Sequence, residues 1–339
     1  MADDPVVIVG AGLAGLSCAR LLADAGVAVR VVERARGVGG RCATRRIEGQ
    51  PVDLGPAFLH GSDARFLAAA RAVEDRTPTR WPLRVRGQGA ACHPSSFLPG
   101  ESQFVYSAGL NALPKQLARG LDVQLASDVV GLDICAGEYG LAFADGSRQT
   151  VRRLVLAMAL EQSARLLQPL AQEEKALRGT LALLETMGSA PCIALLAGYA
   201  KGARELPWDL WYPEDSKILQ LLSLDSQKRA SPEFDVLVLQ ARPRWSRENL
   251  TQSEESWRRA LLEEAARLVG PWAREPAWSQ THRWSFARTV SGTELSGPIL
   301  HRFGEKFIGL AGDVFSPGGG AQGAFLSGAK LAERILQSG

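Results

Sequence analysis

The first forty residues combine short apolar runs with a helical spacing of apolar positions. Residues 5–9 form a continuous apolar run of the kind found in buried parallel strands. In residues 13–25 the apolar side chains recur at helical spacing, and Gly26 ends that segment. A second apolar run follows at 27–32 and ends at Glu33. The pattern predicts a β-α-β unit at the N-terminus.

The rest of the chain predicts a mixed order of strands and helices. Apolar or alternating runs predict strands at 123–134, 153–159, 192–197, 236–241 and 306–311, and a hairpin over 139–148. Helical spacing predicts helices over 161–184, 252–269 and 324–336. Seven of the eight tryptophans fall between Trp208 and Trp284, and this change in composition indicates a second domain.

Both chain ends have an apolar strand, a glycine-rich turn and a helix in this order. We therefore expect an α/β fold with a discontinuous dinucleotide-binding Rossmann domain. We place it over residues 1–75, 104–160 and 285–339. An inserted α+β domain with a mixed sheet, the substrate domain, is expected over 76–103 and 161–284. A length of 339 residues suits two domains at ~100–200 residues each.

Composition narrows the class of protein. The chain is 46% apolar and 22% charged, which is ordinary for a soluble globular protein. The net charge is +3 and the arginines are scattered, so no nucleic-acid partner is expected. No apolar run reaches the ~20 residues of a membrane span, and Asp3 and Asp4 stand where a secretory signal would be basic. A cytoplasmic location is therefore expected.

Cysteines and histidines predict neither a disulfide framework nor a metal site. The cysteines are odd in number and widely spaced, namely Cys18, Cys42, Cys92, Cys135 and Cys192. The histidines are equally dispersed, namely His60, His93, His282 and His301. We expect buried, reduced thiols and no metal.

The N-terminal turn carries a G-x-G-x-x-G pattern at Gly10, Gly12 and Gly15. Gly10 permits the tight turn, Gly12 lets a pyrophosphate approach the backbone, and Gly15 lets the helix pack on the strand. The helix N-terminus then favours the phosphates. Glu33, 18 residues beyond Gly15, stands where a carboxylate binds ribose hydroxyls. Together these features predict dinucleotide binding, and a purely structural turn is the alternative.

Two further glycine segments indicate which dinucleotide binds. Gly39, Gly40 and Arg41 follow the second strand and would place flexible backbone and a positive charge beside a pyrophosphate. A solvated basic turn is the alternative. Near the C-terminus, a glycine cluster at 318–323 precedes the last helix. Asp313 would bind a polyol chain, and the N–H groups near Gly323 and Ala324 would face a flavin ring. A plain glycine-rich helix entry is the alternative there.

These motifs together resemble the FAD-containing amine oxidase superfamily. The resemblance rests on residues 6–41 (VVIVGAGLAGL, then VVER and VGGR) with Gly312-Asp313 and Gly323-Ala324. The segments at 53–55, 245–250 and 282–288, with Gly328, are similar to bacterial renalases within that superfamily. The resemblance implies a glutathione-reductase-like FAD domain and non-covalent FAD.

The resemblance also implies which residues bind the cofactor. Val129, at the end of its strand, would contact the adenine side through its backbone. The full implied set is Gly10, Gly12, Ala14, Gly15, Glu33, Arg34, Gly40, Arg41, Val129, Gly312, Asp313, Gly323 and Ala324.

Two departures bear on the substrate. The lysine that amine oxidases place near the flavin is missing from Ser189-Ala-Pro-Cys192, which suits a renalase. The segment ending in His60-Gly61 is instead similar to polyamine oxidases. His60, Trp284 and Arg288 are the candidate catalytic residues. A loop histidine and ordinary packing of the other two are the alternatives.

The resemblance implies an oxidase that uses O2 to convert dihydronicotinamide isomers of NAD(P)H into NAD(P)+ and H2O2. Arg288 would hold a phosphate or carboxamide. The expected partners are this small molecule and O2, and the expected state is a monomer or homodimer. An amine or polyamine oxidase and a non-catalytic flavin-binding redox sensor remain open alternatives.

Overall fold

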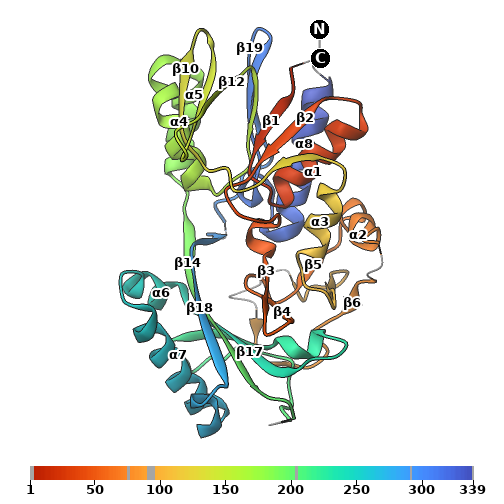
Figure 1. Cartoon of the computed structure of the whole chain (residues 1–339), viewed down its shortest axis with the longest axis vertical. Coiled ribbons are helices and arrows are strands. Elements are labelled where there is room, and N and C mark those ends of the chain that lie inside the picture. The colour runs from red at the N-terminus through yellow and green to blue at the C-terminus, as the bar shows by residue number, and fades with distance from the viewer. Residues whose placement is uncertain (1–3, 75–76, 90–95, 203–204, 291, 338–339) are drawn as a thin grey trace. The chain divides into compact units, whose positions relative to one another are not determined.

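The computed structural model describes residues 4–74, 77–89, 96–202, 205–290 and 292–337. Contacts divide the chain into two compact units, whose elements are labelled in Figure 1. Unit 1 comprises Met1–Gly40, Leu113–Ser189 and Arg288–Gly339. Unit 2 comprises Arg41–Ala112 and Ala190–Ala287.

Unit 1 is built on a six-stranded sheet that is parallel except at one edge. In spatial order its strands are β19 (Ile299–Phe303), β20 (Lys306–Leu310), β13 (Arg153–Leu156), β1 (Val6–Val9), β2 (Val29–Val32) and β9 (Asp122–Gln124). Only β19 runs antiparallel to its neighbour, β20. The central strands are almost wholly apolar and buried, as expected for a sheet covered on both faces. The predicted N-terminal β-α-β unit is confirmed.

Two helices from opposite ends of the chain pack closely in unit 1. They are α1 (Leu13–Asp24) and α8 (Gly320–Gln337). A Cβ added to Gly328 would lie 2.0 Å from the carbonyl oxygen of Ala14. The Ser17 hydroxyl donates a hydrogen bond of 2.8 Å to the carbonyl of Phe325. Gly328 is therefore needed for close helix packing, and it joins the two chain ends in one unit.

A smaller layer of unit 1 combines a meander with two helices. Its elements are β10 (Val129–Cys135), β11 (Glu138–Phe143), β12 (Arg148–Val151), α4 (Leu160–Glu173) and α5 (Lys175–Glu185). The short helix α3 (Ala112–Ala118) is separate from this layer, and its Leu117 carbonyl accepts a hydrogen bond from Arg20 of α1. Leu166 and Leu184 belong to the same buried cluster as Leu132 and Leu141 of the meander. Residues 161–189 therefore group with unit 1, whereas the sequence placed them in the inserted domain.

Unit 2 is built on a second six-stranded sheet. In spatial order its strands are β18 (Trp278–Thr289), β14 (Ser189–Ala200), β17 (Phe234–Ala241), β16 (Leu219–Leu224), β15 (Leu210–Trp211) and β7 (Val85–Arg86). The accompanying helices are α6 (Pro243–Asn249) and α7 (Glu254–Val269). Trp257 and Leu261 of α7 pack with Trp208 and Leu239 in one buried cluster. The tryptophan-rich segment of the sequence thus forms the core between α7 and the second sheet.

The first part of unit 2 consists of short elements. They are β3 (Thr44–Ile47), β4 (Gln50–Asp53), β5 (Leu59–Gly61), α2 (Ala64–Arg71), β6 (Thr79–Arg80) and β8 (Ser102–Val105). Single 3-10 turns are η1 (Gly40–Cys42), η3 (Asp225–Lys228), η4 (Pro271–Arg274) and η5 (Asp313–Phe315), the last in unit 1. Ile47 and Val52 pack against Leu196 and Val236 of the second sheet. Residues 41–74 therefore group with unit 2, in contrast to the predicted boundary.

Three predicted elements differ from the structure. The strand predicted over 123–134 is divided into β9 and β10, because Ala126 has a left-handed φ of 53° between them. The helix predicted over 161–184 is broken by Glu174, whose backbone is extended. The last helix begins at Gly320, four residues before the predicted start.

The thiol prediction holds for three of the four cysteines that the structure describes. Cys18, Cys42 and Cys192 are buried, whereas Cys135 is exposed on β10. Burial raises the pKa of the Cys18 and Cys42 thiols to about 12. All four described cysteines are free, and Cys92 and His93 lie outside the described residues.

Neither a cluster of metal-binding side chains nor a membrane-spanning helix occurs in the described ranges. They contain no group of three or more His, Cys, Asp or Glu side chains placed to hold a metal ion. None of their helices has the length and apolar character needed to cross a bilayer.

Candidate functional site

The first glycine turn leaves open space directly above the start of α1. Gly10 has a φ of +111°, and a Cβ there would lie 2.6 Å from the carbonyl oxygen of Ala157. A Cβ on Gly15 would lie 2.0 Å from the carbonyl oxygen of Gly10. By contrast, a Cβ on Gly12 would meet no atom within 4 Å. Gly10 and Gly15 are thus needed to close the turn, whereas Gly12 keeps the helix N-terminus accessible to an anion.

Glu33 directly follows β2, and its carboxylate is held against this turn. Its Oε2 accepts a hydrogen bond of 2.7 Å from the Ala11 N–H. Its Oε1 accepts one of 2.9 Å from the Ala35 N–H. Glu33 is 8% exposed, and a carboxylate has about four acceptor sites, so ribose hydroxyls could still donate to it. The neighbouring Arg34 is exposed.

The second glycine segment packs on the first. The Gly39 N–H donates to the Ala11 carbonyl at 2.8 Å. A Cβ on Gly40 would lie 3.3 Å from the Cα of Gly12. Arg41 groups with unit 2, where its Nη1 donates to the Ala287 carbonyl at 3.4 Å. The pyrophosphate role of Arg41 stays a prediction.

The C-terminal glycine cluster is arranged differently from the prediction. Because α8 begins at Gly320, the Gly323 N–H is already used and donates to the Gly319 carbonyl at 2.9 Å. The Gly323 N–H is thus part of the helix, and a contact of the N–H groups near Gly323 and Ala324 with a flavin ring stays a prediction. Ala324 lies further into the helix, and the first-turn N–H groups without an intrahelical acceptor include those of Gly320 and Ala321.

Asp313 lies just before this cluster, in η5. It is 8% exposed, and its Oδ2 accepts a hydrogen bond of 2.8 Å from the Thr289 hydroxyl. The preceding Gly312 donates its N–H to the Ser327 hydroxyl at 3.0 Å. The Thr289 bond fixes the Asp313 carboxylate, and its contact with a polyol chain stays a prediction.

Val129 and Ala14 also belong to the cofactor-binding set that the resemblance implies. Val129 is the first residue of β10, so it lies at one end of its strand as predicted, and it pairs with Phe143. Ala14 is buried where α1 faces Gly328. The adenine contact of Val129 stays a prediction. With an open helix N-terminus and two fixed carboxylates, the described residues of unit 1 fit a dinucleotide.

His60 forms a largely buried pair with Glu101 that the sequence did not reveal. Its Nδ1 lies 2.9 Å from Oε2 of Glu101, and the side chains are 20% and 12% exposed. The other Glu101 oxygen, Oε1, accepts a hydrogen bond of 2.8 Å from the Ser62 hydroxyl. Glu101 thereby fixes the tautomer and orientation of the imidazole. The pairing joins residues 41 positions apart, and no sequence motif marks it.

Trp284 and Arg288 lie on β18 in an alternating pattern. His282, Trp284, Phe286 and Arg288 are half-buried, whereas Arg283 between them is exposed. The Trp284 indole N–H donates to the Leu54 carbonyl at 3.0 Å. Exposure thus alternates along the strand from His282 to Phe286, and the lining of a pocket by Trp284, Phe286 and Arg288 stays a prediction.

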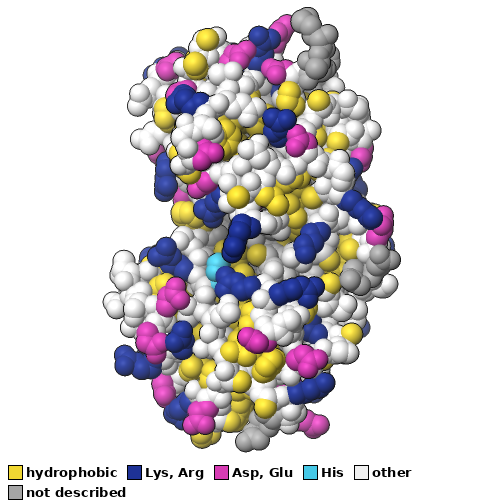
Figure 2. Space-filling view, viewed as in Figure 1, with side chains coloured by type: hydrophobic (Ala, Val, Ile, Leu, Met, Phe, Trp, Pro, Cys, Tyr) yellow, Lys and Arg dark blue, Asp and Glu magenta, His cyan; other side chains and the backbone are white. Residues whose placement is uncertain are grey.

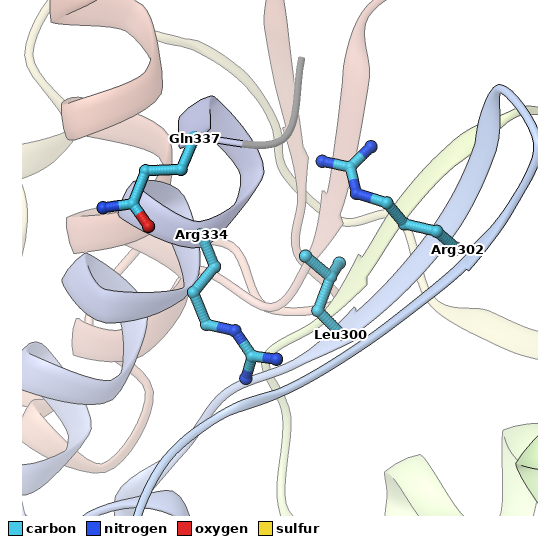
Figure 3. A pocket seen from close by; sticks show the side chains of 4 residues that line it. All are labelled: Leu300, Arg302, Arg334 and Gln337. Carbon is cyan, nitrogen blue, oxygen red and sulfur yellow. The ribbon is translucent and has the colours of Figure 1, made fainter.

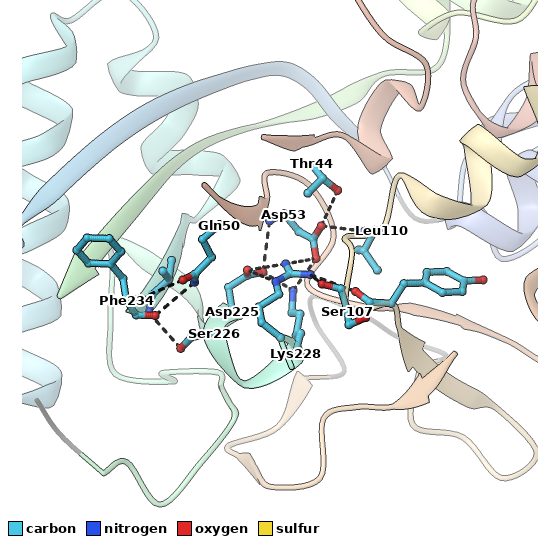
Figure 4. A network of polar contacts seen from close by, with 12 residues as sticks. Thr44, Gln50, Asp53, Ser107, Leu110, Asp225, Ser226, Lys228 and Phe234 are labelled. Carbon is cyan, nitrogen blue, oxygen red and sulfur yellow. Dashed lines mark hydrogen bonds and ion pairs between the residues drawn. The ribbon is translucent and has the colours of Figure 1, made fainter. Parts of the chain in front are cut away.

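A buried network of four charged side chains lies within unit 2 (Figure 4). Lys228 Nζ lies 3.2 Å from Oδ2 of Asp53 and 2.7 Å from Oδ1 of Asp225. Arg229 Nη2 lies 2.9 Å and 2.6 Å from the same two carboxylates. All four side chains are at most 3% exposed. Two acids and two bases balance, as burial of charge requires.

Asp53 is the centre of this network. Its Oδ1 accepts hydrogen bonds from the Thr44 hydroxyl at 2.8 Å and the Leu110 N–H at 2.9 Å. Burial alone would raise the pKa of Asp53, but Lys228, Arg229 and these bonds lower it below its ordinary value. The Asp-Leu-Gly segment noted in the sequence therefore anchors unit 2.

Comparisons with known proteins agree with this geometry. The profile of an NAD(P)-binding Rossmann-like domain matches residues 8–72, and that of flavin containing amine oxidoreductase matches residues 79–336. The zeta-carotene-forming phytoene desaturase of Myxococcus xanthus is 40% identical over 73 residues, 21% of this chain and 14% of its own. Polyamine oxidase 2 of Arabidopsis thaliana is 46% identical over 56 residues, 16% of this chain and 11% of its own. The aligned segments thus span less than a fifth of these curated relatives.

A solved structure extends the likeness of the fold to the whole chain. Cyclohexylamine oxidase from Brevibacterium oxydans has a TM-score of 0.71 at 15% identity and covers 99% of both chains. The profile over 79–336 spans most of the sequence and describes proteins that contain flavin. The predicted fold class, FAD cofactor and FAD-dependent oxidoreductase class are confirmed.

Proposed function

The chain belongs to the flavin-containing amine oxidoreductase family, and we propose that it oxidises dihydronicotinamide isomers of NAD(P)H with O2. The substrate carbon would give up a hydride, and O2 with one proton would finally take the electron pair. The products are NAD(P)+ and H2O2. Bound FAD would supply the two-electron acceptor for the hydride.

The composition of β18 carries this proposal. Its sequence, WSQTHRWSFART, combines aromatic and basic side chains and contains no Asp or Glu. Trp284, Phe286 and Arg288 alternate along it. Aromatic rings suit a planar nicotinamide, and a guanidinium suits its carboxamide or a phosphate. A polycationic amine would instead need carboxylates.

Each of these residues has a role in the proposed reaction. Trp284 is held by its bond to the Leu54 carbonyl, so its ring would orient the dihydropyridine rather than rotate. Phe286 would exclude water from the reacting carbon. Arg288 would bind the negative or polar substituents of the substrate. In unit 1, Glu33 would hold the ribose, and the N–H groups above Gly12 would hold the pyrophosphate of FAD.

An amine or polyamine oxidase is the second candidate, because a specific feature favours it. Glu101 and His60 form a carboxylate–imidazole pair that would accept hydrogen bonds from an ammonium group. The aligned segment of the Arabidopsis polyamine oxidase favours the same reading. Against it, the start of β14 holds Ser189, whose N–H and hydroxyl both donate to Glu161, where related amine oxidases are expected to carry lysine.

Peroxide formation under air separates the candidates. We expect the FAD-loaded protein to form H2O2 and NAD+ from 2- or 6-dihydro-NAD, and not from spermine or benzylamine. Replacement of Arg288 by Gln should lower kcat/KM by about 10-fold or more, because a charge-assisted bond is lost. Arg244→Gln, an exposed change on α6, is the matched control and should have no effect. Turnover of the amines alone would establish the second candidate, and no turnover with FAD bound would indicate a non-catalytic flavoprotein.

A further inference from the structure

We propose that a basic hollow in unit 2 binds a phosphate-class oxyanion. The hollow has a volume of about 790 Å³ and opens between the first turn of α7, the middle of β18 and β3. Its charged and polar lining includes Arg45, Arg258, Arg283, Glu254, His282 and Gln280. All these residues belong to unit 2, so the inference rests on one compact unit.

The charge of the lining is positive and incompletely balanced. Three arginines face one glutamate in the hollow. The Arg45 guanidinium donates to the Gln280 side-chain oxygen at 2.8 Å, which is a neutral partner. Across the described ranges, neither Arg45 nor Arg283 forms an ion pair with a carboxylate. The space-filling view of one face shows Lys and Arg side chains, in dark blue, next to a histidine (Figure 2). Cations without anionic partners in a concave surface favour an anionic ligand.

The start of α7 adds donors to the same hollow. The Ser253 hydroxyl caps the helix by accepting a hydrogen bond from the Ser256 N–H. Glu254, the one acid in the lining, is already tied to β18, because its Oε2 accepts a 2.9 Å bond from the Thr281 hydroxyl. Arg258 pairs with Glu255 through Nη1, whereas its buried Nε has no hydrogen-bond partner. An oxyanion in the hollow would gain from the guanidinium charge of Arg258 and from the helix dipole.

His282 reports on the charge in the hollow. Its ring lies 4.4 Å from that of Trp284 in an edge-on arrangement. Burial and then Arg45 lower the pKa of His282, so the imidazole is neutral at pH 7. The charged groups around the hollow are Arg45 from β3, Arg258 and Glu254 from α7, and Arg283 from its own strand. A bound anion would offset the arginines and raise this pKa.

A second hollow, in unit 1, differs from the basic hollow in its size and in the partners of its arginines (Figure 3). It measures about 340 Å³ and also contains two arginines, Arg302 and Arg334. Arg302 donates to the Ile335 carbonyl at 3.0 Å, and Arg334 donates to the Pro298 carbonyl. Backbone carbonyls thus already use these guanidinium groups, in a hollow less than half the size. The basic hollow is the stronger anion site.

Calorimetric titration of the FAD-loaded protein with inorganic pyrophosphate tests the proposal, because bound FAD already fills the glycine turn. We expect saturable binding that weakens by about 10-fold or more in R45Q/R283Q, and by a smaller factor in R283Q alone. Arg259→Gln is the matched control, since Arg259 is exposed on α7 outside the hollow. It should change the affinity by less than about 2-fold. The single exposed change at Arg283 keeps the test available if the double variant does not fold.

Two further arms identify the ligand chemistry and the place of binding. AMP should bind and adenosine should not, and AMP binding tighter than pyrophosphate would assign the hollow to a nucleotide. In NMR titrations, pyrophosphate should raise the pKa of His282. The proposal is overturned if pyrophosphate does not bind, binds equally to R45Q/R283Q, or leaves the His282 titration unchanged. None of these readouts depends on turnover, so they fail or succeed separately from the proposed oxidase reaction.

Discussion

The glycine turn of unit 1 and the charged network of unit 2 are held together over very different sequence distances. In the turn, Gly10 contacts Gly15 and Ala11 contacts Glu33, which is 22 positions away, although Gly10 also lies against the distant Ala157. In the network, Asp53 meets Lys228 and Arg229, which are 175 and 176 positions away. Residues that contact each other and are close in sequence form a recognisable motif. Residues that contact each other from distant parts of the chain appear in the sequence as single charged residues without a pattern.

The polar groups of the two regions also have different roles, ligand binding in the turn and stabilisation in the network. The carboxylate of Glu33 and the N–H groups above Gly12 retain capacity for a ligand. The carboxylates of Asp53 and Asp225 are fully used by protein donors and are almost completely buried. We therefore expect substitutions in the network to change stability, and substitutions in the turn to change cofactor affinity.

Asp53→Asn should have the largest effect. The variant leaves Lys228 and Arg229 facing a single buried carboxylate, which typically costs about 3–5 kcal/mol. The free energy of unfolding in urea, measured with FAD absent, gives this loss. Asp24→Asn is the matched control, because its ion pair with Arg20 is exposed and should contribute less than about 1 kcal/mol.

The pH dependence of the same variant sharpens the test. The pKa of Asp53 is lower in the folded protein than in the unfolded chain. Its contribution is therefore present above the unfolded value near ~4 and is lost as pH falls through the folded value. The stability gap between wild type and Asp53→Asn should shrink as the solution is acidified. A gap that stays constant would contradict the ionised network.

Gly328→Ala should come next, because it tests helix packing rather than a ligand. The added Cβ would lie 2.0 Å from the Ala14 carbonyl oxygen on α1. Overpacking of this kind costs about 1–3 kcal/mol. Gly179→Ala in α5 meets no atom within 4 Å and should be neutral or stabilising by up to about 1 kcal/mol. Thermal unfolding of both variants would refute the packing argument if they behaved alike.

Gly12→Ala should leave stability nearly unchanged and weaken FAD binding. Its Cβ meets no protein atom within 4 Å and would occupy the space above the helix N-terminus. A loss of about 10-fold in affinity corresponds to ~1.4 kcal/mol. Flavin fluorescence during reconstitution of the apoprotein measures it. Unchanged affinity together with lower stability would reverse the contrast drawn between the turn and the network.

His301 should give the smallest effect. Its Nε2 lies 2.7 Å from the Thr180 hydroxyl, and burial and then Arg334 lower its pKa. The unfolded chain takes up this proton first, so wild type should lose stability relative to His301→Gln as pH falls below ~6.5. Urea titrations between pH 7 and 5 compare the two proteins. Parallel pH profiles would exclude this contribution.

The sequence predicted what is local and missed what depends on distant contacts. The strand at Val6–Val9, helix α1 and the carboxylate of Glu33 follow from neighbouring residues, and the structure contains them. The partnership of His60 with Glu101 could not be inferred, because it depends on how two strands pair in unit 2. The charges that surround Asp53 were hidden for the same reason.

The start of α8 shows a different limit. Glycines at 318–320 have positive φ values and low helix propensity, so the sequence placed the helix start near Gly323. The bond from the Gly323 N–H to the Gly319 carbonyl shows that the helix has already formed there. The cluster of glycines therefore located the helix correctly but led to a predicted start four residues too late.

Anaerobic stopped-flow absorbance of the yellow holoprotein tests the central claim, that a dihydronicotinamide is the hydride donor, most directly. Mixing with 2- or 6-dihydro-NAD should bleach the flavin absorbance rapidly, and air should restore it with release of NAD+ and H2O2. Spermine and benzylamine should leave the spectrum unchanged. Bleaching by an amine and not by either isomer would contradict the account.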